Sequence, residues 1–260
     1  MEKTGAAFKF FIHKIFLLLH PHQTVAGFFF QFLQIMIHPK TIQFLKQLSK
    51  HNNKPWFDAH RPQYEEARSD MEKFIQSVID KHSVKDPDLA GLTARKCIFR
   101  INRDVRFSKN KQPYKTNFGA SMDRGGKKSG FAGYYFHLEP GKSFVGGGLW
   151  MPEAPVVKKV RQEIDYCLEE FESIILNKKF KQAYKELYHE EQGIKLVNVP
   201  RDFEKDNPAA EYLKFKSWLA IANLSDEDVT SKELVKKTLH AFEVLQPLVK
   251  FLNRAIDTAA

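Results

Sequence analysis

The sequence predicts a single α+β domain. In it, an antiparallel β-sheet of roughly residues 96–150 packs against N-terminal and C-terminal helices. Apolar residues recur at helical spacing on both sides of this region. Inside it, apolar and polar residues alternate with a period of two, and turns containing Gly or Pro separate the alternating runs. Helices on both sides of a run of antiparallel strands are typical of the α+β class.

Two helices are predicted before the sheet. The first covers residues 41–50, and the second has Pro62 in its first turn and ends near His82. Trp56 lies in a short turn between them, and we expect its ring to pack in the core. The apolar face of the second helix should contain Tyr64, Ala67, Met71, Phe74, Ile75, Val78 and Ile79.

Four segments have the alternation of β-strands. Pro140-Gly141 is a turn signal between the last two of them, so these two should form a hairpin. The four predicted strands are residues 97–102, 118–122, 132–139 and 142–150.

Helical spacing returns after the sheet, over residues 156–176, 180–187 and 234–256. Thr230-Ser231-Lys232-Glu233 has the pattern of a capping box that would open the last helix. Pro247 predicts a kink or a break inside that helix. Residues 211–222 fit neither pattern, so Lys214 and Lys216 share a face only if this segment is extended.

Residues 1–35 differ from the rest of the chain. They contain eight of the 23 phenylalanines and two apolar runs, neither of which reaches the ~18 residues of a membrane-spanning helix. We interpret them as an extension outside the domain of residues 36–257, with Met36 as the natural start and the preceding residues as upstream sequence translated in frame. A membrane-surface anchor is the alternative.

Positive charge is concentrated in one part of the chain. The net charge is +10, and residues 95–128 alone contribute +9, from eleven Lys/Arg against Asp104 and Asp123. Such a density repels itself unless an anion or an acidic protein face offsets it. We call residues 95–128 the basic segment. Because residues 129–260 carry a net −2, pairing with acidic helices remains an alternative to ligand binding.

The basic segment combines cations with hydroxyl and aromatic side chains. Asp104 lies between Arg103 and Arg106 and is placed to hold one guanidinium in a fixed orientation. Phe107 and Tyr114 can pin the segment or stack on a base. The candidate anion-binding residues are Arg100, Arg103, Arg106, Ser108, Lys109, Lys111, Tyr114, Lys115 and Thr116.

The predicted hairpin supplies the other candidate group. Alternation places Tyr135, His137 and Glu139 on one face of their strand, where His137 and Glu139 could act as an acid/base pair. Gly146-Gly147-Gly148 on the partner strand indicates either an open floor beside them or a helix packed closely on the glycines. We favour a structural role for His137, and keep His137 and Asp104 as candidate proton carriers.

Several site classes have no pattern in this sequence. There is no phosphate-binding P-loop, no dinucleotide-binding glycine motif, no His-Glu-x-x-His and no nucleophile elbow. The two cysteines have no metal-ligand spacing, and Cys97 lies in an apolar run typical of a buried thiol. No metal ligands are predicted, and the cofactor is unknown.

Several ordered motifs resemble a family of conserved hypothetical proteins, the domain of unknown function 2461. They are residues 103–120, residues 132–141, Gly146–Gly148, residues 52–57 and residues 200–218. The resemblance covers about residues 38–256 and begins near Met36. It names a family without implying a particular reaction or particular catalytic residues.

The sequence is compatible with three functions. The first is binding of nucleic acid or another polyphosphate, or of a phosphorylated small molecule, by the basic segment. The second is an enzyme that acts on a small anionic substrate, with Arg103 and Arg106 as clamps. The third is docking on an acidic protein partner. We expect a cytoplasmic protein in which residues 36–260 do not associate with a membrane, and the sequence does not predict an oligomeric state.

Overall fold

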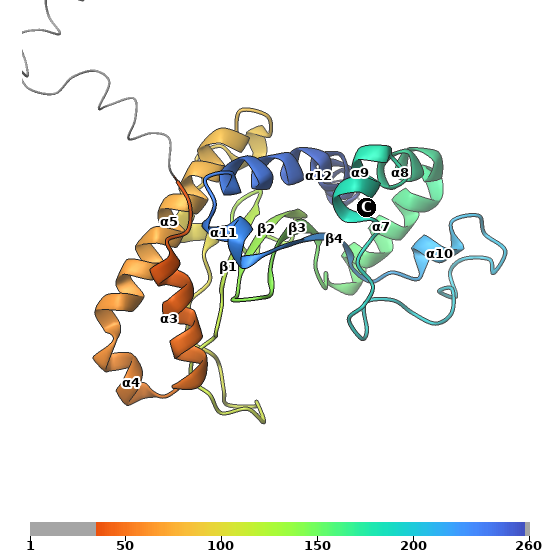
Figure 1. Cartoon of the computed structure of the whole chain (residues 1–260). Helices are drawn as coiled ribbons and strands as arrows, with labels where there is room; N and C mark the ends of the chain where they lie inside the picture. Colours follow the sequence, from red (N-terminus) through yellow and green to blue (C-terminus); the bar gives the residue numbers. More distant parts are fainter. Residues whose placement is uncertain (1–34, 258–260) are drawn as a thin grey trace, which may run out of the picture. The chain divides into compact units, whose positions relative to one another are not determined.

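A computed structural model describes residues 35–257, of which residues 36–257 belong to one compact unit. The described residues contain ten α-helices, one short 3-10 helix and a four-stranded antiparallel sheet (Figure 1). The predicted α+β class is therefore confirmed. The interpretations of residues 1–34 fall outside the described residues.

Three helices precede the sheet: α3 (Pro39–Lys50), α4 (Lys54–Ala59) and α5 (Arg61–His82). The Asn53 side chain caps α4 by accepting a hydrogen bond from the Trp56 N–H. All seven apolar residues predicted for the inner face of α5 are buried. Trp56 is only half-buried, because its ring stacks on His60 at 4.0 Å near the surface rather than entering the core.

The sheet has the order β1 (Phe118–Asp123), β2 (Gly133–Leu138), β3 (Ser143–Leu149) and β4 (Trp218–Leu224), and all neighbours are antiparallel. The hairpin predicted at Pro140-Gly141 joins β2 to β3. The last strand comes from the segment that the sequence left unassigned.

The first predicted strand, residues 97–102, is wrong. Its start belongs to the short helix α6 (Ala94–Cys97), and the rest makes only the isolated bridges Ile98–Ala120 and Asn102–Tyr114. From the first bridge to the second, one segment moves forward by four residues, from Ile98 to Asn102. Its partner moves back by six, from Ala120 to Tyr114. This change of register prevents a continuous ladder, although the residues still run beside β1.

Helix α12 (Leu234–Asp257) covers one face of the sheet (Figure 1). The rings of Tyr134 and Phe242 lie 4.8 Å apart, and a Cβ added to Gly147 would lie 2.9 Å from Leu245 Cδ2. The close packing of a helix on the glycine run, one of the two predicted explanations, therefore holds for Gly147. The adjacent Gly146 and Gly148 face the opposite side of the sheet, because successive residues of a strand alternate.

The remaining helices are η1 (Pro87–Leu89), α7 (Ala154–Tyr166), α8 (Leu168–Ile175), α9 (Lys178–Tyr184), α10 (Ala210–Leu213) and α11 (Asp226–Thr230). The single helix predicted over residues 156–176 is divided at Cys167, where φ is −118° and ψ is 40°. Helix α12 continues through Pro247, so of the predicted kink or break, the break does not occur.

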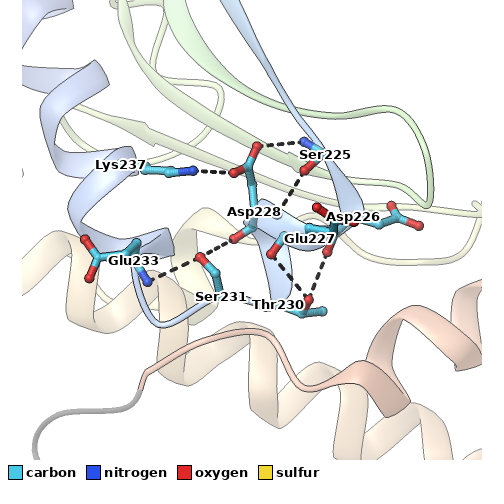
Figure 2. Close-up of polar contacts among 8 residues, drawn as sticks. All are labelled: Ser225, Asp226, Glu227, Asp228, Thr230, Ser231, Glu233 and Lys237. Carbon is cyan, nitrogen blue, oxygen red and sulfur yellow. Dashed lines mark hydrogen bonds and ion pairs between the residues drawn. The ribbon is translucent and has the colours of Figure 1, made fainter.

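The capping box lies five residues before the predicted one. Ser225 Oγ accepts a hydrogen bond from the Asp228 N–H, and the Asp228 carboxylate accepts one from the Ser225 N–H, which opens α11 (Figure 2). Thr230 instead donates to the Asp226 and Glu227 carbonyls in the first turn of α11, and Ser231 Oγ accepts from the Glu233 N–H before α12 (Figure 2). The sequence pattern therefore identified the capping chemistry at the wrong residue pair.

Irregular segments cover both outer strands of the sheet. On the β1 side, the Phe99 N–H donates to the Gly119 carbonyl at 2.9 Å. On the β4 side, the Tyr188 N–H donates to the Leu219 carbonyl at 2.7 Å.

His82 makes stability depend on pH. Its ring is 1% exposed, and neither ring nitrogen has a hydrogen-bond partner among the described residues. Burial lowers the pKa of His82, against an opposing effect of the Asp86 and Glu243 charges. The unfolded chain therefore binds a proton at a higher pH than the folded chain. The free energy of unfolding should decrease as the pH falls through the ordinary histidine range near 6.5.

We predict that His82→Phe removes this pH dependence, because phenylalanine keeps a ring against Tyr134 and has no proton to bind. The measurement is the melting temperature of both proteins between pH 7.5 and pH 5. Relative to the native chain, the variant should gain stability steadily as the pH falls. A difference that stays constant over this range would show that His82 does not carry the effect.

Candidate anion-binding surface on the sheet

The basic segment is held in place by side chains far away in the sequence. The Asn52 amide group donates to the Tyr114 carbonyl at 2.9 Å and accepts from the Tyr114 N–H at 3.1 Å. The Tyr114 ring is 6% exposed and stacks on Phe57 at 4.0 Å. Of the two roles predicted for Tyr114, its ring therefore takes the structural one and pins the segment to α4.

Three of the predicted anion-binding cations are engaged in the segment itself. Arg103 donates to the Gln112 carbonyl at 3.0 Å and to Ser108 Oγ at 3.4 Å, and Lys111 donates to the Val105 carbonyl at 3.1 Å. Arg106 binds both oxygens of Asp104, at 3.0 and 2.7 Å.

The guanidinium held by Asp104 is thus that of Arg106. These hydrogen bonds lower the pKa of Asp104, which makes this carboxylate a poor proton acceptor near neutral pH.

The other cations of the segment have few acidic partners. Of the eleven Lys/Arg in residues 95–128, only three form ion pairs among the described residues: Arg95 with Glu72, Arg106 with Asp104 and Arg124 with Asp257. Pairing with acidic helices elsewhere therefore accounts for only two cations, Arg95 and Arg124. The other eight include Arg100, Lys109 and Lys115 of the predicted set.

Two of the unpaired cations lie close to one ring, and two more act on the first of them through their charge. Lys115 Nζ is 5.3 Å and Lys127 Nζ is 5.7 Å from the centre of the Phe99 ring. Burial lowers the pKa of Lys115, and so do the charges of Arg100 and Lys128. We call Arg100, Lys115, Lys127 and Lys128 the Phe99 cluster. A lysine whose charged form is disfavoured by neighbouring cations favours the binding of an anion.

A row of aromatic side chains continues from this cluster along the sheet face opposite α12. The Tyr135 ring centre lies 6.4 Å from that of Phe99 and 5.7 Å from that of Phe144. Phe144 in turn stacks on His137 at 4.7 Å. All four rings remain partly exposed. We call Phe99, Tyr135, His137 and Phe144 the aromatic row.

His137 is held by its neighbours on both sides. Its Nε2 is 3.1 Å from a Glu139 oxygen, and its Nδ1 is 3.3 Å from the Asn117 amide nitrogen. Burial lowers the pKa of His137, and the hydrogen bond with Glu139 opposes this effect. The predicted pair with Glu139 is therefore present, but both ring nitrogens already have protein partners. This geometry favours a structural role over proton transfer.

The remaining predicted residues take different positions. Thr116 Oγ1 donates to Glu139 at 3.4 Å, Ser108 lies against Arg103, and Lys109 is exposed. Lys127 and Lys128 were not among the candidate residues predicted from the sequence, although the charge count of the segment included them. Phe99 and Phe144 carried no signal, because alternation alone does not tell which face of a strand stays exposed.

The family model of the conserved hypothetical proteins DUF2461 matches residues 40–251. The chain belongs to this family. The DUF2461 match runs from α3 into α12 and includes the whole basic segment, which confirms the resemblance found in the sequence motifs. No curated protein and no solved structure matches the chain.

Two other classes of feature are absent from the described part of this DUF2461 protein. No group of three or more His, Cys, Asp or Glu side chains is placed to hold a metal ion among residues 35–257. None of the described helices combines the length and apolar composition needed to cross a bilayer.

We predict that Asn52→Ala loosens the basic segment. The substitution removes two hydrogen bonds to a partly buried backbone, which should lower the free energy of unfolding by about 1–3 kcal/mol. Trypsin cleavage at Arg106, Lys109 and Lys111 should become faster. Limited proteolysis with mass spectrometry measures both site and rate. Asn223→Ala, at an exposed asparagine of β4, is the control and should leave cleavage unchanged; equal acceleration in both variants would contradict the anchoring role.

Proposed function

We propose that this protein binds single-stranded nucleic acid on the face of the sheet opposite α12. Phosphates would lie at the Phe99 cluster, and bases would stack along the aromatic row. The observation that carries the proposal is the scarcity of acidic partners: eight of the eleven cations in the basic segment have no ion pair among the described residues.

The aromatic row favours a single strand over other polyanions. Proteins that bind single strands combine a positively charged surface with aromatic side chains, on which successive bases stack. A phosphate group alone needs only the cations. Phe107 adds to this support, because its ring is 96% exposed at the tip of the basic segment and packs in no core. Its neighbour Arg106 lies 5.8 Å from the ring centre.

The two alternatives have weaker support. An enzyme acting on a small anion would need a proton carrier, but both ring nitrogens of His137 have protein partners and Asp104 is held by Arg106. An acidic protein partner would use the cations but has no need of the aromatic row. We include a cytoplasmic location in the proposal, because Cys97 and Cys167 are both free thiols, as is usual in a reducing compartment.

We predict that affinity for a fluorescent single-stranded oligonucleotide falls steeply with salt, because bound phosphates release counterions. Lys115→Gln/Lys128→Gln should weaken binding and flatten the plot of log K against log salt by about 0.7 for each lost phosphate contact. Fluorescence anisotropy at several salt concentrations measures both quantities.

The matched control is Lys178→Gln/Lys179→Gln, which removes the same charge from exposed positions on α9. It should bind like the native chain. Equal loss in the two double variants would reduce the effect to overall charge. Salt-independent binding, or none at low salt, would overturn the proposal. Stronger binding of an acidic protein than of the oligonucleotide would favour the docking alternative.

We also predict that Phe107→Ala weakens oligonucleotide binding by about 1–3 kcal/mol, the usual range for one stacked base. The fold should be unaffected, because the ring is almost fully exposed. Anisotropy gives the affinity, and the melting temperature is the control for stability. Phe107→Tyr keeps a stacking ring and should bind normally. If Phe107→Ala binds as tightly as the native chain, the tip of the segment does not contact a base.

A further inference from the structure

A cavity lies away from the basic segment, where α7 begins. Its volume is about 480 Å³, within the range of small-molecule sites in proteins. The connection from β3 to α7 contributes Met151, α7 itself contributes Val157, and residues 196–203 contribute Leu196 and Phe203. We call it the α7 cavity. Four apolar side chains on two opposed segments give it an apolar wall.

Three cations and a single carboxylate also line the α7 cavity. The cations are Lys158, Arg161 and Lys216, and the carboxylate belongs to Asp202. No ion pair joins Asp202 to any of the three among the described residues, and no other carboxylate there pairs with them. The charge of the lining is therefore uncompensated by two units.

Arg161 is the best-placed cation in this lining. Its Nη2 donates to the Phe215 carbonyl at 3.0 Å, which holds the guanidinium in position. Its Nε is buried and has no acceptor among residues 35–257. Burial lowers the pKa of Arg161, and the charge of Asp202 opposes this effect only in part. An anion in the cavity would stabilise the charged guanidinium, which binds carboxylate and phosphate oxygens well.

Exposed apolar side chains lie at the lining residue Met151 and directly beside lining residues in the chain. Met151 and its neighbour Trp150 are each 53% exposed, and Val197, next to Leu196, is 88% exposed. Met151 has φ at +42°, a left-handed backbone that is uncommon outside glycine, and its N–H donates to the buried Ser217 Oγ at 2.8 Å. Large apolar groups left in water beside a cavity are typical of ligand-binding sites.

We propose that the α7 cavity binds a small organic anion, with a carboxylate or phosphate head against the three cations and an apolar body against the apolar wall. This site is independent of the nucleic-acid surface. The two sites differ in their surroundings. The cations here lie beside apolar side chains in a cavity, whereas those of the nucleic-acid surface lie beside a row of partly exposed rings.

The test uses naphthoate and naphthyl phosphate with the full chain, and isothermal titration calorimetry as the readout. Naphthalenemethanol has the same apolar body without charge, and inorganic phosphate has the charge without the body. At least one naphthyl anion should bind, and tighter than either control compound, by about tenfold or more. The preferred head, carboxylate or phosphate, then identifies the ligand class.

Two variants locate the binding. Arg161→Met and Lys216→Gln should each weaken the naphthyl anion by about tenfold. Lys216→Gln removes no side-chain hydrogen bond of the described residues, so it remains informative if Arg161→Met is unstable. Lys178→Gln, outside the cavity, is the control and should bind normally. Both cavity variants should bind the oligonucleotide unchanged, and Lys115→Gln/Lys128→Gln should bind the naphthyl anion unchanged, which separates this proposal from the first.

Four results would overturn the proposal. Binding of neither naphthyl anion at millimolar concentration would show that the cavity has no such ligand. Equal binding of naphthalenemethanol would show that the cations play no part, and equal binding of inorganic phosphate would show the same for the apolar wall. Binding that survives both cavity variants would place the anion elsewhere on the chain.

Discussion

The contact between α12 and the sheet determines which surfaces of this protein are available for function. Helix α12 lies against Gly147, where any side chain would meet Leu245, and Tyr134 packs on Phe242 beside this contact. The close approach commits one face of the sheet to the core. Because strand residues alternate, the side chains of Tyr135, His137 and Phe144 must then lie on the other face. The aromatic row is thus a consequence of where α12 packs.

The cations of the basic segment fall into two groups, and only one of them adds available charge to that face. The tip of the segment uses Arg103, Lys111 and the Arg106–Asp104 pair to hold its own conformation. Its base, beside β1, leaves the Phe99 cluster without acidic partners. The division matters for interpretation, because a raw charge of +9 overstates what a ligand can contact. Of the cations without acidic partners, Lys115 and Lys127 lie beside the partly exposed Phe99 ring.

The sequence predicted the fold class, the hairpin and the buried face of α5, because each depends on a local period that one segment contains. It failed where a distant partner decides the outcome. Residues 97–102 alternate like a strand, but their pairing register with residues 114–120 shifts. Asn52 and Tyr114 show no mutual signal across 62 positions. Lys127 and Lys128 belong to the site only because the turn after β1 brings Lys127 beside Phe99 and the charge of Lys128 near Lys115. The lining of the α7 cavity comes from three separate segments, so no single motif predicted it.

The covered edges of the sheet have a consequence for assembly. Strands at the edge of a sheet are ready templates for pairing with another chain, and exposed edges promote aggregation. Here the Phe99 N–H already donates a hydrogen bond to a carbonyl on the outer side of β1, and the Tyr188 N–H donates one to a carbonyl on the outer side of β4. A partner that adds a strand to this sheet must first displace one of these segments. Displacement on the β1 side would also move Phe99 away from its lysines, so sheet extension and anion binding at this edge should compete.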